Sequence, residues 1–107
     1  LAFLLRISMD AYGLREEVTA FIVDQARECG IAKVVLFGSR ASGRFSEKSD
    51  IDLAVCGASF DRYIGILDES CPTLLTFDFV DMSQEVGEGL RERIAQEGVV
   101  LYEACEL

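Results

Sequence analysis

Histidine is absent from the chain, proline occurs once, and the four cysteines include no Cys-x-x-Cys pair. A His-dependent catalytic triad and a zinc site of the usual spacing are therefore both disfavoured. The low proline content, with half of the residues hydrophobic, indicates a folded globular domain rather than a disordered or fibrous chain. In so apolar a chain we expect the cysteines to be small, buried, reduced core residues: Cys29, Cys56, Cys71 and Cys105.

Positive charge is also scarce. Ten Lys and Arg face 19 Asp and Glu, which gives a net charge of −9 and a pI near 4.3. Such a surface repels nucleic-acid backbones, so unaided DNA or RNA binding is not expected. No apolar run approaches the roughly 20 residues needed to span a bilayer, and the apolar residues 1–5 are too few for a signal-peptide core. These features favour a cytoplasmic protein.

The chain is expected to form one domain over residues 1–107, with 1–11 a disordered or artefactual extension and Met9 the natural start. Apolar periodicity predicts a helix over 14–29, helices capped by Ser59 and Ser83, and a short helical turn at 39–42. The same patterns predict strands over 31–37, buried on both faces, and over 51–56, 74–82 and 99–102, the last at an edge. This order indicates an α/β (α+β) fold, a small mixed β-sheet with helices packed on it.

The predicted strand over 31–37 ends abruptly in Gly38 and Ser39. Gly38 lacks the Cβ atom that would block a triphosphate. Ser39 offers a hydroxyl and backbone N–H groups at the start of a helical turn, where phosphate binding is favoured. Arg40 is interpreted as a phosphate ligand or, equally simply, as a partner in a surface salt bridge.

Acidic residues occur where apolar residues are expected. Asp50 and Asp52 lie two apart at the start of an apolar strand, so both side chains lie on one face and can share metal ions. Asp78 interrupts a later strand and completes a triangle of carboxylates if the two strands are neighbours. Asp81 falls on the opposite face of that strand and carries less weight. Magnesium is the expected metal because it prefers oxygen ligands and binds through a few carboxylates plus substrate phosphates.

Each element alone is weak, because a Gly-Ser pair is most often a turn and Asp-x-Asp occurs by chance in acidic proteins. Their combination resembles the minimal nucleotidyltransferases of the DNA polymerase β-like superfamily, whose signature is hydrophobic-Gly-Ser, a spacer and Asp-hydrophobic-Asp. The signature matches residues 36–43 and 49–55, and the later strand that carries the family's third carboxylate matches residues 77–81. The resemblance covers the chain from about Tyr12 onward and implies the polymerase β-like fold. It implies catalytic and metal-binding roles for Asp50, Asp52 and Asp78, and nucleotide-binding roles for Gly38, Ser39 and Arg40.

Members of this family transfer a nucleoside monophosphate from a nucleoside triphosphate to an acceptor hydroxyl, using two magnesium ions. The minimal members are commonly encoded beside a HEPN-domain toxin, and as antitoxins they silence this ribonuclease by adding AMP to a tyrosine. The resemblance thus implies a Mg-dependent protein adenylyltransferase with ATP as substrate and a HEPN toxin as partner. The short chain agrees, since a partner protein would have to bring the acceptor.

Two other interpretations stay open. A non-catalytic antitoxin would keep the fold, bind nucleotide and inhibit by binding alone. Transfer to a small molecule such as an aminoglycoside, or to a nucleic-acid end, is disfavoured by the small size and the acidic charge. An exposed helix face would serve a homo-oligomer or a docked partner equally well.

Overall fold

The computed structural model describes residues 2–3 and 12–104 of the chain. Its elements are β1 (Ala2–Phe3), α1 (Glu16–Glu28), β2 (Ile31–Phe37), α2 (Gly38–Ser42), β3 (Ile51–Gly57), α3 (Phe60–Ser70), β4 (Phe77–Asp81), α4 (Glu88–Glu97) and β5 (Val99–Ala104). The strands form one five-stranded mixed sheet in the order β1-β5-β2-β3-β4. Strands β3 and β4 are parallel, and the other described pairs are antiparallel.

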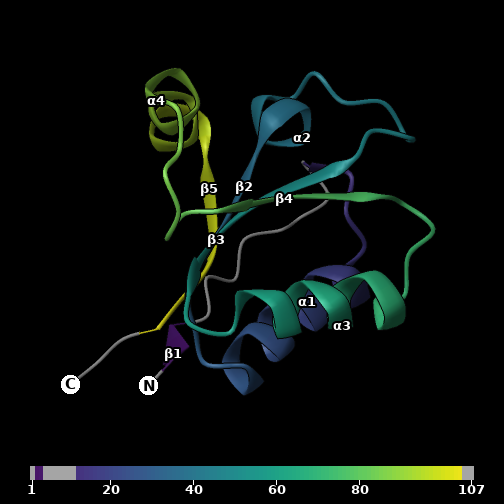
Figure 1. Ribbon diagram of the computed structural model, residues 1–107. Coiled ribbons are helices and arrows are strands. Elements are labelled where there is room, and N and C mark those ends of the chain that lie inside the picture. The colour runs from purple at the N-terminus through teal and green to yellow at the C-terminus, as the bar shows by residue number, and fades with distance from the viewer. Residues whose placement is uncertain (1, 4–11, 105–107) are drawn as a thin grey trace.

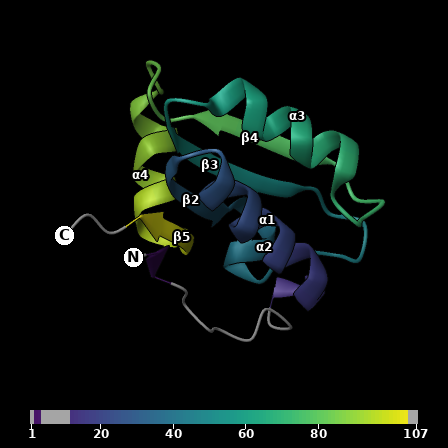
Figure 2. The same ribbon diagram turned by 90° about the horizontal axis from the view of Figure 1, so that it is seen from below.

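The helices divide between the two faces of the sheet. Helices α1 and α3 lie on one face, and α2 and α4 lie on the other (Figure 1). Seen from below, α1 and α3 both lie in front of the sheet (Figure 2), where α1 contacts β2 and α3 contacts β3 and β4. The other face is covered by α2, a helix of five residues, and by α4, which packs against β2. We call this second side the open face.

The core lies between the sheet and the α1–α3 layer. Alternate side chains of β2 and β3 are fully buried there, because residues two apart on a strand share one face: Val34, Leu36, Ile51, Leu53 and Val55. Burial of each such side chain stabilises the fold by roughly 1.5–3 kcal/mol. The hydroxyl of Tyr63 on α3 donates to the carbonyl of Ile22 on α1 at 2.8 Å, which joins the two helices.

Local sequence explains how α1 begins and ends. Glu16 and Glu17 lie in its first turn and Arg27 in its last, which is the arrangement that the helix dipole favours. Gly30 follows with a φ of +70°, a left-handed conformation that glycine adopts without strain, and the chain turns into β2. The helix predicted over 14–29 is therefore confirmed.

The other predicted elements are present, with five corrections. The strand predicted over 74–82 is shorter and covers only Phe77–Asp81, since the chain bends at 74–75 and Leu74 is exposed. Strand β2 alternates between buried and partly exposed residues instead of being buried on both faces. On the open face, α2 and α4 cover it only partly. The N-cap of α4 is Gly87, and Ser83 instead donates to Asp81. Ser59 is the N-cap of α3 but its side chain makes no capping hydrogen bond. Strand β5 is not an edge strand, because β1 pairs with its free side.

Cysteine burial differs from the expectation. Cys29 is buried, but Cys56 is exposed on β3 and Cys71 is only partly buried after α3. The prediction for Cys105 concerns a residue outside the described part. Of the predicted N-terminal extension, residues 2–3 form β1, and the rest of that prediction falls outside the described residues. Within the described ranges, no helix is long and apolar enough to cross a membrane.

Candidate active site

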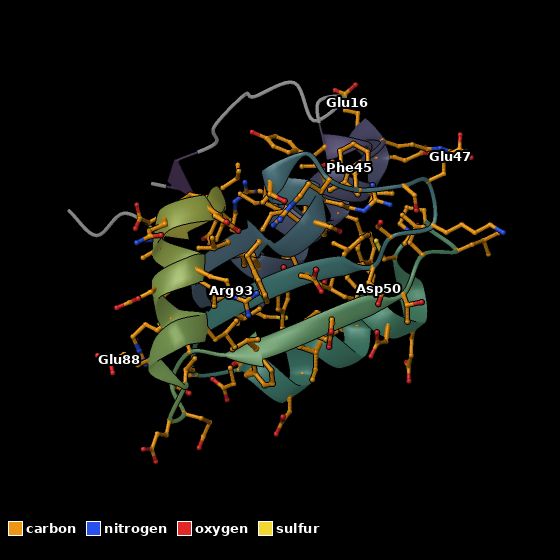
Figure 3. The ribbon with its side chains drawn as sticks, turned by 90° about the horizontal axis from the view of Figure 1, so that it is seen from above. Glu16, Phe45, Glu47, Asp50, Glu88 and Arg93 are labelled. Carbon is orange, nitrogen blue, oxygen red and sulfur yellow. The ribbon has the colours of Figure 1, made fainter. Side chains whose placement is uncertain are left out.

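Two of the predicted carboxylates lie side by side on neighbouring strands. In the parallel register of β3 and β4, Asp52 is paired directly with Asp78. Because Ile51 and Leu53 point into the core, Asp52 between them points to the open face. Asp50 lies two residues before Asp52 at the end of the sheet where β3 begins (Figure 3). The three carboxylates predicted from the sequence thus occupy one end of the open face.

The charges at this site repel one another. The pKa of Asp52 is raised above its ordinary value, first by burial and then by the negative charges of Asp78 and Asp50. The positive charge of Arg40 opposes this shift. The fold therefore holds Asp52 in a place that disfavours its ionised form, and a bound cation would relieve that cost.

The glycine of the Gly-Ser turn lies directly over Asp52. Gly38 has a φ of +75°, and a Cβ atom there would collide with the Asp52 carboxylate. Phe37, the residue before it, is paired with Asp52 across β2 and β3. Glycine was expected at this position for the approach of a phosphate, and the packing of Asp52 is a second reason for it. Ser39 follows in the first turn of α2 and is partly exposed, and its phosphate-binding role stays a prediction.

Arg40 does not lie on the surface, so the surface salt bridge expected for it is wrong. Its side chain is 1% exposed. Its Nε donates to the carbonyl of Ser49 at 3.1 Å, and its Nη2 donates to the same carbonyl at 2.9 Å and to that of Glu47 at 3.4 Å. Its Nη1 donates to the carbonyls of Tyr12 and Gly13 at 2.9 and 3.2 Å. These bonds use all five N–H groups of the guanidinium, so none is left for a phosphate or a carboxylate.

Asp81 lies on the opposite face of β4 from Asp78, as the two-residue period of the strand predicts. It is paired with the buried Val55, on the face opposite Asp78. Its Oδ1 accepts hydrogen bonds from the N–H and the hydroxyl of Ser83 at 3.0 and 2.6 Å. Asp81 therefore stabilises the turn after β4.

One cation near the open face was not singled out from the sequence. Figure 3 shows Arg93 extending from α4 toward the strands, whereas Glu88 of the same helix points away from the sheet. The helical period carried a signal for this, since Arg93 precedes Ile94, the residue of α4 that is buried against the sheet. No ion pair joins Arg93 to another residue of the described ranges.

The residues of the open face fit a magnesium ion by their chemistry. The acidic groups of this face are carboxylates, and the fold brings Asp52 beside Asp78 in spite of their repulsion. Asp52 is close enough to Asp78 and Asp50 for their charges to raise its pKa. However, no three His, Cys, Asp or Glu residues within 2–3 and 12–104 are gathered tightly enough to hold a metal ion by themselves. Magnesium commonly binds in this way, through one or two carboxylates completed by waters and substrate phosphates.

A strand that ends in Gly-Ser beside paired carboxylates on an open sheet face is typical of a nucleotidyltransferase. Comparison with known families agrees: residues 20–106 match the family described as "Polymerase beta, Nucleotidyltransferase". The chain belongs to this family, and the polymerase β-like fold expected from the sequence is confirmed.

Solved structures share the fold. A crystal structure of a toxin-antitoxin with AMP-PNP superposes with a TM-score of 0.64 at 22% identity, covering 80% of this chain and 73% of that one. A mutant of the toxin-antitoxin MntA-HpeT gives a TM-score of 0.63 at 21% identity, with the same coverage. At these identities the likeness concerns the fold. None of the curated proteins compared with the sequence matches it.

Proposed function

We propose that this nucleotidyltransferase is an antitoxin that transfers AMP from ATP to a hydroxyl of its partner toxin, a tyrosine of a HEPN-domain protein. The observation that carries the proposal is the pairing of Asp52 with Asp78 beside Gly38 on the open face. The family supports the transfer reaction. The toxin-antitoxin complexes with the same fold, one of them holding AMP-PNP, support the partner and the nucleotide.

In the proposed reaction the acceptor oxygen attacks the α-phosphorus of ATP. The bond from that phosphorus to the bridging oxygen of the β-phosphate breaks, and pyrophosphate leaves. Asp78, on the strand at the outer side of the site, receives the acceptor proton. Asp50 and Asp52 would hold Mg²⁺ together with Asp78, and bound Mg²⁺ would offset the charge of the triphosphate and favour ionisation of the acceptor hydroxyl. Gly38 and Ser39 would lie against the phosphates.

The proposal is tested by incubating the chain with ATP, Mg²⁺ and the toxin, and by measuring the intact mass of the toxin. Its mass should rise by one AMP for each modified hydroxyl, and the increase should be lost when the acceptor tyrosine of the toxin is replaced by phenylalanine. A toxin that is neutralised without any change of mass, equally by the wild type and by Asp52→Asn, would show that the antitoxin acts by binding alone. Modification of an aminoglycoside or an RNA end in its place would assign a different acceptor.

Arg93 provides a prediction for nucleotide binding. Arg93→Ala is expected to weaken binding of Mg-ATP about tenfold, because a charge-assisted contact to a phosphate is lost. Arg91→Ala is the matched control: it removes the same charge from α4, about 200° away around the helix. Calorimetric titration with a non-hydrolysable ATP analogue gives both affinities. Equal weakening by the two substitutions would mean that Arg93 acts only through the net charge of the protein.

A further inference from the structure

Arg40 is a charged side chain buried inside the described fold, and it makes no ion pair there. Burial of a guanidinium is costly unless its hydrogen-bonding groups are satisfied. Here backbone carbonyls satisfy all five N–H groups, at 2.9 to 3.4 Å. Such an arrangement suits a residue that fixes the backbone around it more than one that contacts a ligand.

The carbonyls bound by Arg40 belong to two chain segments that are distant in sequence. One is Tyr12–Gly13, which precedes α1, and the other is the segment 47–49, which ends immediately before Asp50. Arg40 itself lies on α2, two residues after Gly38. The guanidinium therefore connects the Gly-Ser turn with the segment that leads into the Asp-x-Asp strand.

The strongest contact is with the peptide that joins Ser49 to Asp50. The carbonyl of Ser49 accepts from both Nε and Nη2, a fork that fixes its orientation. The N–H of Ile51 donates to the carbonyl of Thr76, at 2.8 Å, in the segment that leads into β4. Asp50 is thus held from the Ser49 side by Arg40 and from the Ile51 side by the chain that carries Asp78.

Neighbouring groups enclose the guanidinium. The ring of Phe45 lies 5.2 Å from its central carbon. Gly13 has a φ of +68°, and a Cβ atom there would come within 2.8 Å of Arg40 Nη1 and also collide with Phe45. The chain thus closes around the charged group, and this keeps the five hydrogen bonds from competing with water.

We propose that Arg40 is a positioning residue, which holds Asp50 on the open face by fixing the Ser49–Asp50 peptide and which contacts no phosphate itself. The inference rests on the proposed function, because it assigns Asp50 to the metal site. Lysine cannot replace this residue, since an ammonium group has three donors and no planar fork.

The test compares Arg40→Lys with Tyr63→Phe, which removes a buried hydrogen bond between α1 and α3 without touching the site. For Arg40→Lys, amide hydrogen exchange should rise locally in residues 47–52, and the affinity for Mn²⁺, used as a probe for Mg²⁺, should fall about 10–100-fold. Tyr63→Phe should leave the local exchange and the Mn²⁺ affinity unchanged, even where it lowers the melting temperature. Unchanged local exchange in Arg40→Lys, or an equal loss of Mn²⁺ affinity in the two variants, would overturn the proposal.

A measurement on the wild type covers the case in which Arg40→Lys fails to fold. The Arg40 Nε–H signal in a ¹⁵N NMR spectrum should exchange slowly with solvent and should stay in place when Mg²⁺ and a non-hydrolysable ATP analogue are added. A large shift together with faster exchange would mean that the guanidinium leaves the carbonyls for the phosphates, which contradicts the proposal. If the wild type binds neither Mn²⁺ nor nucleotide, the proposed function fails, and the exchange pattern of residues 47–52 still decides the role of Arg40.

Discussion

Asp52→Asn is expected to lower the rate of AMP transfer at least about 10³-fold while leaving the free protein no less stable than the wild type. The rate should fall because the amide removes the central carboxylate of the proposed metal site, which is paired with Asp78 and lies against Gly38. Stability does not fall, because burial and the neighbouring carboxylates disfavour the ionised form of Asp52 in the folded protein. An asparagine has no such form.

The pH dependence of stability follows from the sign of this shift. The folded-state pKa of Asp52 lies above its ordinary value of 3.8, so the folded protein binds the proton more tightly than the unfolded chain does. The resulting stabilisation is complete below the ordinary pKa and is lost as the pH rises through the raised value. Relative to the wild type, Asp52→Asn should therefore gain stability as the pH rises from about 4 to 7.

Thermal unfolding across this pH range, combined with single-turnover transfer rates, measures both effects. Asp81→Asn is the matched control, since Asp81 lies on the opposite face of β4 and an asparagine oxygen can still accept from Ser83. Its transfer rate should stay within about twofold of the wild type. If Asp52→Asn keeps its activity, or if Asp81→Asn loses as much, the assignment of the open face as the active site is wrong.

Gly38→Ala is expected to lower transfer about 10²-fold, whereas Gly43→Ala should lower it no more than a few-fold. Both glycines have positive φ, +75° and +81°, so an alanine costs each roughly 1–2 kcal/mol of backbone strain. The difference lies in the space around them: a Cβ atom at Gly38 would collide with the Asp52 carboxylate, and one at Gly43 would meet nothing within 4 Å. Only Gly38→Ala should displace the Asp52 carboxylate, which we propose binds the metal.

Transfer rates and Mn²⁺ affinity, measured below the melting temperature of each variant, separate strain from displacement. The two variants should lose similar backbone stability, and Mn²⁺ affinity should fall in Gly38→Ala alone. A similar loss of activity in both would indicate that α2 matters only through the stability of its turn.

The sequence singles out the carboxylates because their signal is local, and their role as metal ligands stays a prediction. Asp52 and Asp78 each interrupt an apolar strand and Asp50 immediately precedes one, and an acid in such a place is costly without a cation or water. Whether Asp78 reaches Asp52 depended on the pairing of β3 with β4, which lies outside local periodicity and became visible only in the register. The face of Asp81 could be predicted, because the two-residue period of a strand fixes it.

The environment of Arg40 could not be read from the sequence. Arginine is rarely buried, and the carbonyls that bind it come from segments 27 and 28 residues earlier and 7 and 9 residues later in the chain. The capping role expected of Ser83 failed for a similar reason. Ser83 donates its hydroxyl and N–H to Asp81 in a turn, and α4 begins only at Glu88.

The identity of the group that is attached to the toxin decides whether the chain catalyses nucleotidyl transfer. The chain, Mg²⁺ and the toxin are incubated with ATP labelled either at the α-phosphate or at the γ-phosphate. The label from the α-phosphate should become covalently attached to the toxin, and the label from the γ-phosphate should be released as pyrophosphate, with neither seen for Asp52→Asn. Attachment of the γ-phosphate label to the toxin, or no attachment of either, would contradict nucleotidyl transfer at the open face.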